Sequence, residues 1–481
     1  MARPAPDPLL YIGGRGAFGL VFALLLASAP ALAAIPTPVA QALSAGGIPE
    51  SAVALYVHEI GAPRAVVSHG AERPMNPAST MKLVTTYAGL ELLGPAYTWS
   101  TEIHAAGRIQ NEVLAGDLVV KGYGDPKLTL ENFWLLLRSL RARGVRDIRG
   151  DVLLDRTHFF TDDFDPARFD GDPIRPYNTG PDALLVNFKA VTVQLVPEPE
   201  SRSVRLVTEP MIESIQVVNN VALTDGPCGD WVAKLKFDAQ GGNDASRLTI
   251  SGPFSRDCGE RTRSFSLLAH RPYAGALFSQ LWKDLGGTVS GTIRDGALPP
   301  GARLLVSARS PALSEIVRDI NKYSNNVMAR QLFLILGALG GAPGTMEKAR
   351  GVIREWLVEK GLPMPELAME NGSGLSRSER ISARSMGEML LDAFRSPTMP
   401  EFISSMPIVA ADGTMRKRLS NADVAGQAHV KGGTLNGVRA IAGYVLDARG
   451  RRVVVVLFVN HANAGNAQAA QDALLRWVYR R

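Results

Sequence analysis

The stretch Asn76-Pro77-Ala78-Ser79-Thr80-Met81-Lys82-Leu83-Val84 decides the fold, because it joins a turn to an apolar segment and carries a serine and a lysine three positions apart. Pro77 stands where a helix begins and Gly94-Pro95 where it ends, so a helix is predicted over residues 80–93. Residues three apart share a helix face, which lets the side chains of Ser79 and Lys82 meet. A serine hydroxyl needs an adjacent base to act as a nucleophile, and burial of Lys82 in this apolar run would favour its uncharged, basic form.

Two further segments carry polar groups suited to the same chemistry. Ser324-Asn325-Asn326 lies between a helix that ends near residue 320 and the apolar run 327–339. It either caps the second helix or points a hydroxyl and an amide into a cleft. Lys431-Gly432-Gly433-Thr434 lies on a predicted strand, which two glycines weaken unless something must approach closely. The alternatives are a substrate backbone added alongside, with Lys431 attracting a carboxylate, and a glycine-rich bulge with a solvated lysine.

Both ends of the chain have the pattern of strands in one sheet. Apolar runs bounded by turn residues predict two strands near the N-terminus, three near the C-terminus and a last helix: residues 51–58, 64–68, 428–435, 438–446, 451–460 and 467–478. The last strand is apolar without alternation, which is typical of a strand covered on both faces. We therefore predict an α/β (α+β) protein with an antiparallel five-stranded sheet flanked by helices, interrupted by a long insertion.

The order S-x-x-K, S-x-N, K-x-G on these elements resembles the motif set of penicillin-binding proteins and class A β-lactamases. The long gap between Lys82 and Ser324 is similar to that of the class C low-molecular-mass penicillin-binding proteins, the D-alanyl-D-alanine carboxypeptidase/endopeptidases of the penicillin-binding protein 4 type. Residues 120–126, 370–377, 411–414 and 443–444 also resemble that family. The resemblance implies a penicillin-recognising serine transpeptidase/β-lactamase-like domain (residues 35–105 and 306–481), an inserted domain (106–190 and 266–305) and a β-rich domain nested in it (191–265).

The resemblance also implies an activity and a role for each motif residue. The expected reaction is serine-type D-Ala-D-Ala carboxypeptidase and D,D-endopeptidase cleavage of peptidoglycan stem peptides and cross-links through an acyl-enzyme on Ser79, with β-lactams such as penicillins as covalent inhibitors. Lys82 is expected to take the serine proton and Ser324 to pass it to the leaving amine. The expected substrate-binding groups are the Asn326 side chain, the Lys431 ammonium, the strand at Gly433, the Thr434 hydroxyl, and the backbone N–H groups of Ser79 and Thr434 as an oxyanion hole.

Some relatives line a pocket for the free end of meso-diaminopimelate, and the resemblance places Asp155, Phe160, Arg377 and Asn436 there; a surface or interdomain contact is the alternative for each. Gly432 departs from the family, which usually has Thr or Ser at this position to help hold the carboxylate. This departure keeps a catalytically weak peptidoglycan-binding protein open as an alternative, beside a β-lactamase. Penicillin turnover and acylation of Ser79 would distinguish the three.

The remaining features concern export, partners and cofactors. Residues 1–34 combine basic residues, a short apolar run and the end Ala31-Leu32-Ala33, which predicts a cleaved signal peptide, a periplasmic location with at most peripheral membrane association, and no transmembrane anchor after cleavage. Cys228 and Cys258 are then expected to form a disulfide. The net charge of +6 without a long Lys/Arg run argues against nucleic-acid binding. No Cys/His spacing indicates a metal, no cofactor is expected, and a homodimer stays open.

Overall fold

The computed structural model describes residues 34–161 and 164–481, so the predicted signal peptide lies outside the described residues apart from its last position. One five-stranded antiparallel sheet combines both ends of the chain, and it confirms the predicted sheet and fold class. Its strands follow the order β16 (Ala428–Leu435), β17 (Val438–Leu446), β18 (Arg452–Asn460), β1 (Val53–Glu59) and β2 (Val67–His69).

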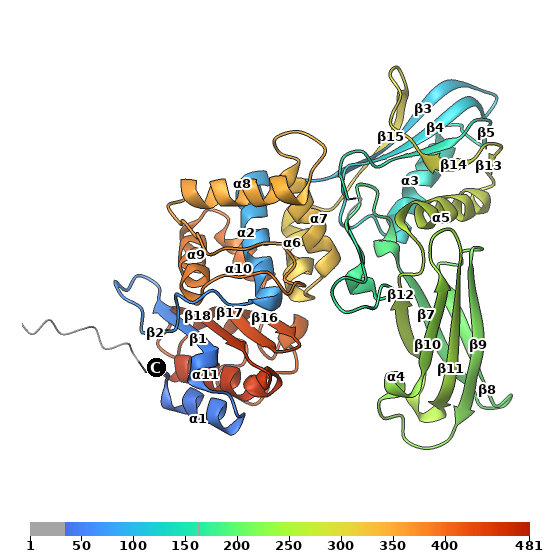
Figure 1. The fold of residues 1–481 in the computed structure, drawn as a ribbon. Helices are drawn as coiled ribbons and strands as arrows, with labels where there is room; N and C mark the ends of the chain where they lie inside the picture. The colour runs from blue at the N-terminus through green and yellow to red at the C-terminus, as the bar shows by residue number, and fades with distance from the viewer. Residues whose placement is uncertain (1–33, 162–163) are drawn as a thin grey trace, which may run out of the picture.

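Helices cover both faces of this sheet (Figure 1). The strand β18 shows why, since its residues 453–459 are all buried. Val454, Val456 and Phe458 belong to one core, and the residues between them belong to the opposite core. The first core is shared with α2 (Lys82–Leu93), α6 (Leu313–Lys322), α7 (Asn326–Gly337), α8 (Met346–Glu359), α9 (Ala383–Arg395) and α10 (Met399–Ser405). The second is shared with α1 (Thr37–Ala45) and α11 (Gln468–Arg480).

The middle of the chain forms a second, seven-stranded sheet to one side of the first (Figure 1). Two helices pack on it, α3 (Leu130–Ala142) and α5 (His270–Asp284). The predicted boundaries of the inserted domain, 105/106 and 305/306, fall inside two strands of this sheet that pair with each other, at residues 100–110 and 303–309. The strands are β3 (Ser100–Gln110), β4 (Val113–Gly122), β5 (Asp147–Ile148), β6 (Val152–Asp155), β13 (Thr288–Val289), β14 (Ile293–Asp295) and β15 (Arg303–Arg309).

Two three-stranded sheets enclose a further core within this region. One contains β7 (Val191–Glu198), β8 (Ser203–Glu209) and β12 (Arg261–Phe265); the other contains β9 (Ile215–Thr224), β10 (Lys236–Gly241) and β11 (Ser246–Ser255). A disulfide joins Cys228 to Cys258 beside the short helix α4 (Trp231–Lys234). The division into three domains stays a prediction. Within residues 34–161 and 164–481, no helix is both long and apolar enough to cross a membrane.

Candidate active site

Ser79 lies in a 3₁₀ turn, Ala78–Met81, that leads directly into α2. Side chains three apart are eclipsed in a 3₁₀ turn, and Lys82 Nζ lies 3.2 Å from Ser79 Oγ. Ala78 has a φ of 45°, a left-handed conformation that non-glycine residues rarely adopt. The turn is fixed by Asn76, whose side-chain oxygen accepts from Ala78 N at 2.9 Å and whose backbone N–H donates to Asn460 on β18 at 2.8 Å. The sheet therefore positions the serine.

Lys82 is fully buried and has three polar contacts. Besides Ser79, its amine donates to the side-chain oxygen of Asn326 at 2.6 Å and to the backbone carbonyl of Ser373. Burial, followed by the nearby charges of Lys431 and Arg330, lowers the pKa of Lys82 well below its usual value. An uncharged amine has two N–H groups and one lone pair. The two carbonyl oxygens use both N–H groups, which leaves the lone pair for the proton of Ser79.

Ser324 and Lys431 form the second half of the site. Ser324 has a φ of 57° in the loop between α6 and α7, and its hydroxyl accepts from Lys431 Nζ at 2.7 Å. The N-cap of α7 is Asn325, whose side chain accepts a hydrogen bond from Met328 N at 3.1 Å. Ser324 therefore does not cap this helix. Lys431 is fully buried rather than solvated, and burial lowers its pKa to about 7.

The strand β16, at the edge of the sheet, passes unusually close to the serine. A Cβ atom on Gly433 would lie 2.9 Å from Ser79 N, so only glycine permits this approach. A Cβ atom on Gly432 would meet only the flexible end of Met415, at 3.2 Å. The segments at 79–82, 324–326 and 431–434 therefore surround one place, with the hydroxyls of Ser79 and Ser324, two amines and a strand edge.

Two supporting groups were missed by sequence reasoning. The Ser373 carbonyl, which orients the Lys82 amine, comes from a loop held by Glu379, whose buried carboxylate accepts from the backbone N–H groups of residues 370, 371 and 372. Gly374, with a φ of 78°, lets this loop lie against the serine turn, where a Cβ would come 2.0 Å from Ala78 O. The glycine spacing in residues 370–377 was the available signal.

A third missed residue is Arg439, which lies directly opposite Thr434 in the β16–β17 hairpin. Its guanidinium donates to the Thr434 hydroxyl at 2.8 Å and to the Gln468 side chain at 2.7 Å. The Asn436-Gly437 turn was the signal, because a two-residue turn of this type fixes which residues face each other across the hairpin.

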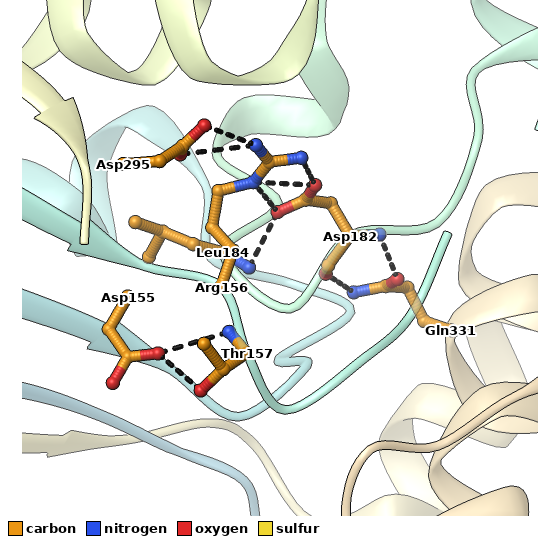
Figure 2. A network of polar contacts seen from close by, with 7 residues as sticks. All are labelled: Asp155, Arg156, Thr157, Asp182, Leu184, Asp295 and Gln331. Carbon is orange, nitrogen blue, oxygen red and sulfur yellow. Dashed lines mark hydrogen bonds and ion pairs between the residues drawn. The ribbon is translucent and has the colours of Figure 1, made fainter. Parts of the chain in front are cut away.

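The four residues expected to bind diaminopimelate lie in different surroundings. Arg377 donates to the backbone oxygen of Asn436 at 2.9 Å, so these two meet. Phe160 is 53% exposed. Asp155 is buried in β6, where its carboxylate accepts from Lys121, Thr157 and the Leu298 N–H at 2.6–2.8 Å; Figure 2 shows the Thr157 contacts. Within the described part of the chain, no hydrogen bond links Asp155 or Phe160 to the other two, and their roles stay predictions.

The sheet with a serine–lysine pair beside its edge strand defines a serine peptidase of the penicillin-recognising class. Residues 36–480 match the D-Ala-D-Ala carboxypeptidase 3 (S13) family, and the chain belongs to this family.

Named relatives agree with this membership. The chain is 29% identical over 415 residues to a D-alanyl-D-alanine carboxypeptidase of Actinomadura sp. (strain R39), which covers 83% of this chain and 76% of the relative. It is 25% identical over 426 residues to the D-alanyl-D-alanine carboxypeptidase DacB of Haemophilus influenzae, covering 88% of each. Its fold is similar to the crystal structure of penicillin binding protein 4 (dacB) from Haemophilus influenzae, with a TM-score of 0.79 and 24% identity over 92% of this chain and 99% of that chain. The predicted enzyme class, a serine-type D-Ala-D-Ala carboxypeptidase, is confirmed.

Replacing Gly432 by threonine is expected to raise the release of D-alanine from a pentapeptide. The flexible end of Met415 can move to admit the new Cβ, and the added hydroxyl can donate to the substrate carboxylate. One such hydrogen bond is worth about 0.5–1.5 kcal/mol, which corresponds to a rise in kcat/KM of roughly two- to thirteenfold. Gly432→Ala adds the Cβ without the hydroxyl and is the control. Equal rates for the threonine and alanine variants would contradict a role for the hydroxyl.

Substrate affinity is expected to fall as the pH rises through about 7, because the pKa of Lys431 lies there and only its ammonium form attracts a carboxylate. Because a single group, Lys431, loses its charge, the affinity for substrate can fall by at most about tenfold per pH unit. The measurement is the dissociation constant of a D-Ala-D-Ala peptide between pH 6 and 9 on a Ser79→Ala background, where turnover does not intervene. In the Lys431→Arg variant the cation persists, so the curve should flatten; a flat curve in the parent protein would contradict the assignment.

Proposed function

We propose that this protein is an exported D,D-peptidase that cuts the bond after a D-alanine through a covalent acyl-enzyme on Ser79. The observation that supports it most is the Lys82 amine, which is buried, has a lowered pKa and lies 3.2 Å from Ser79 Oγ while it donates to Asn326 and to the Ser373 carbonyl. Such an amine is a general base poised beside its nucleophile.

In the proposed reaction Lys82 removes the proton of Ser79 while the serine oxygen attacks the carbonyl of the penultimate D-alanine. The backbone N–H groups of Ser79 and Thr434 stabilise the negative charge that develops on the carbonyl oxygen. Ser324, hydrogen-bonded to Lys431, passes a proton to the leaving amine, and Asn326 holds the peptide amide. Water then attacks the acyl-enzyme and releases the shortened peptide.

Arg439 joins the carboxylate-binding groups in this proposal. Its two hydrogen-bond partners, Thr434 and Gln468, are uncharged, and no described acidic side chain forms an ion pair with it. Asp472, whose charge acts on Arg439, is paired with Arg418. The guanidinium thus carries an unmatched charge beside the Thr434 hydroxyl, where it compensates for the missing hydroxyl at Gly432.

Arg439→Ala is expected to raise KM for a peptide that ends in a free carboxylate, with kcat little changed. A hydrogen bond to a charged group is worth about 1.5–3 kcal/mol, so the rise is roughly ten- to 150-fold. A peptide with a C-terminal amide lacks the charge and should lose far less. Arg449→Ala, in the exposed hairpin at the other end of β17, is the charge-matched control. An equal loss on both peptides would remove Arg439 from carboxylate recognition.

Digestion of purified peptidoglycan, with mass analysis of the products, tests the proposed function. Loss of terminal D-alanine indicates carboxypeptidase action, and conversion of cross-linked dimers to monomers indicates endopeptidase action. Penicillin is expected to form a long-lived adduct on Ser79, mapped by peptide mass. Rapid penicillin turnover would favour a β-lactamase instead, and unchanged peptidoglycan with no adduct would favour a binding protein.

Location and partners follow from the same proposal. The similar protein of Haemophilus influenzae is named a penicillin binding protein, which supports β-lactams as covalent inhibitors here. The residues ahead of α1 support export to the periplasm. Arg377 and Asn436, which are joined by a hydrogen bond, are the better-supported half of a diaminopimelate pocket. A monomer and a homodimer both remain compatible with the proposal.

A further inference from the structure

A cavity of about 670 Å³ lies away from the active site, between the seven-stranded sheet and the sheet formed by β9, β10 and β11. None of Ser79, Lys82, Ser324 or Lys431 lines it. Its walls mix apolar side chains such as Ile174 and Leu267 with polar groups, and its volume is that of a small-molecule site.

Lys189 lines this cavity, and its residue is only 7% exposed. It ends a turn in which Asn187, Phe188 and Lys189 have φ angles of 46°, 53° and 54°. Three successive non-glycine residues in the left-handed region cost about 1–2 kcal/mol each. Asn187 holds the turn by donating to Ala190 O and Tyr273 Oη, each at 3.1 Å. Backbone strain that the surrounding structure maintains often marks a functional site. Here the strained turn places the Lys189 side chain in the wall of the cavity.

The other charged groups of the wall are matched. Arg156 donates to Asp182 and to Asp295, at 3.0 Å and 3.2 Å (Figure 2). Burial lowers the pKa of His270 to about 4, so its ring is uncharged. The Lys189 ammonium has no hydrogen-bond or ion-pair partner among residues 34–161 and 164–481, although the charge of Asp182, which is paired with Arg156, acts on it. Burial lowers its pKa to about 8, which leaves it mainly charged at neutral pH. A buried ammonium without a counterion is unfavourable, and an anion would relieve that cost.

A second feature of the cavity also favours an anion. The 15-residue helix α5 begins at His270, and His270, Arg271 and Pro272 line the cavity. No side chain caps this end, and its first turn contains no acidic residue. A helix N-terminus presents unsatisfied N–H groups and a partial positive charge. The lysine and the helix end therefore face one space from two independent elements.

We propose that this cavity binds the carboxylate of a peptidoglycan stem peptide, as a second, non-catalytic site. Only the choice of ligand rests on the proposed function. The stem peptide that the proposed peptidase cuts carries free carboxylates and short apolar side chains, which suit this cavity. Product held there would keep the enzyme on the polymer between cleavages.

The test uses the full mature chain with its active site blocked by penicillin, and a stem tetrapeptide as the probe in titration calorimetry. The acylated protein is expected to bind one tetrapeptide, and Lys189→Gln to weaken that binding at least tenfold. Lys236→Gln removes the same charge from an exposed position on β10 and should bind as the parent does. Lys189→Arg keeps the charge and should retain most of the affinity.

Absence of binding to the acylated parent protein, or equal binding by parent and Lys189→Gln, would overturn the second site. So would inorganic phosphate binding at least as tightly as the tetrapeptide. Penicillin labelling of every variant keeps the two proposals apart, because labelled protein that does not bind tetrapeptide contradicts only the cavity. Removing an unpaired buried charge should maintain or raise the melting temperature of Lys189→Gln, so loss of binding cannot be ascribed to unfolding when that temperature is unchanged.

Discussion

Ser79→Ala is expected to abolish both covalent penicillin labelling and D-alanine release, with a fall of at least about 10⁴-fold in the rate of acylation. In the described chain the Ser79 hydroxyl is the one that the Lys82 amine contacts, at 3.2 Å, while the Ser324 hydroxyl is held by Lys431. Both cysteines are in the disulfide, so neither supplies a substitute thiol. Intact-protein mass after incubation with penicillin is the measurement.

The fold should survive this substitution. Lys82 keeps its contacts with Asn326 and the Ser373 carbonyl, and Ala78 and Asn76 still define the turn. The melting temperature should therefore stay near that of the parent protein. Ser404→Ala, on the exposed side of α10, is the matched control and should label normally. A penicillin adduct at any other residue of the Ser79→Ala variant would contradict the assignment of the nucleophile.

Lys82→Arg is expected to lower the acylation rate by about 10²–10⁴-fold, the usual contribution of a general base. A guanidinium stays charged at any pH at which the protein is folded, so it has no lone pair for the serine proton. It would also place a permanent charge near Lys431 and Arg330 in a fully buried position, so a loss of stability is expected with the loss of rate.

Lys82→Met separates these two effects. The sign follows from the direction of the shift: burial lowers the pKa of Lys82 in the folded protein, so protonation of this amine favours the unfolded chain. Methionine removes that effect, and the free energy of unfolding should stay equal or rise while acylation is lost. Stopped-flow acylation by a chromogenic β-lactam gives the rate, and chemical denaturation gives the stability. More than about a tenth of the parent rate in either variant would contradict Lys82 as the base.

Local patterns predicted the parts of the fold that local chemistry controls. The strands β16 and β17 begin and end at the predicted residues, and a two-residue Asn-Gly turn separates them. The pairing of the two chain ends was predicted from two strand-like segments near the N-terminus and three near the C-terminus, and β1 and β18 do pair. The extent of β3 and β15 was not, since their register depends on contacts across about 200 residues, which no local pattern reports.

The site shows the same division. The residues of the S-x-x-K, S-x-N and K-x-G motifs were predictable, because the role of each requires a particular residue type at a fixed spacing. The Ser373 carbonyl was not, because any residue supplies a backbone oxygen and only the loop held by Glu379 decides which one reaches Lys82. Gly432 was identified as a departure from the family, but the Met415 methyl that occupies the vacant space became visible only in three dimensions.

The place where the long middle region joins the rest of the chain has an evolutionary consequence. Trp99 and Ser310 are held together by two hydrogen bonds, from Trp99 N to Ser310 Oγ at 3.0 Å and from Ser310 N to Trp99 O at 2.9 Å. Joining the two ends of a loop becomes harder only slowly with loop length, by about 0.6 kcal/mol per doubling. The residues between them can therefore lengthen, shrink or be exchanged over generations while the acylating serine keeps its neighbours. One reactive centre can in this way be fitted to cell walls of different architecture.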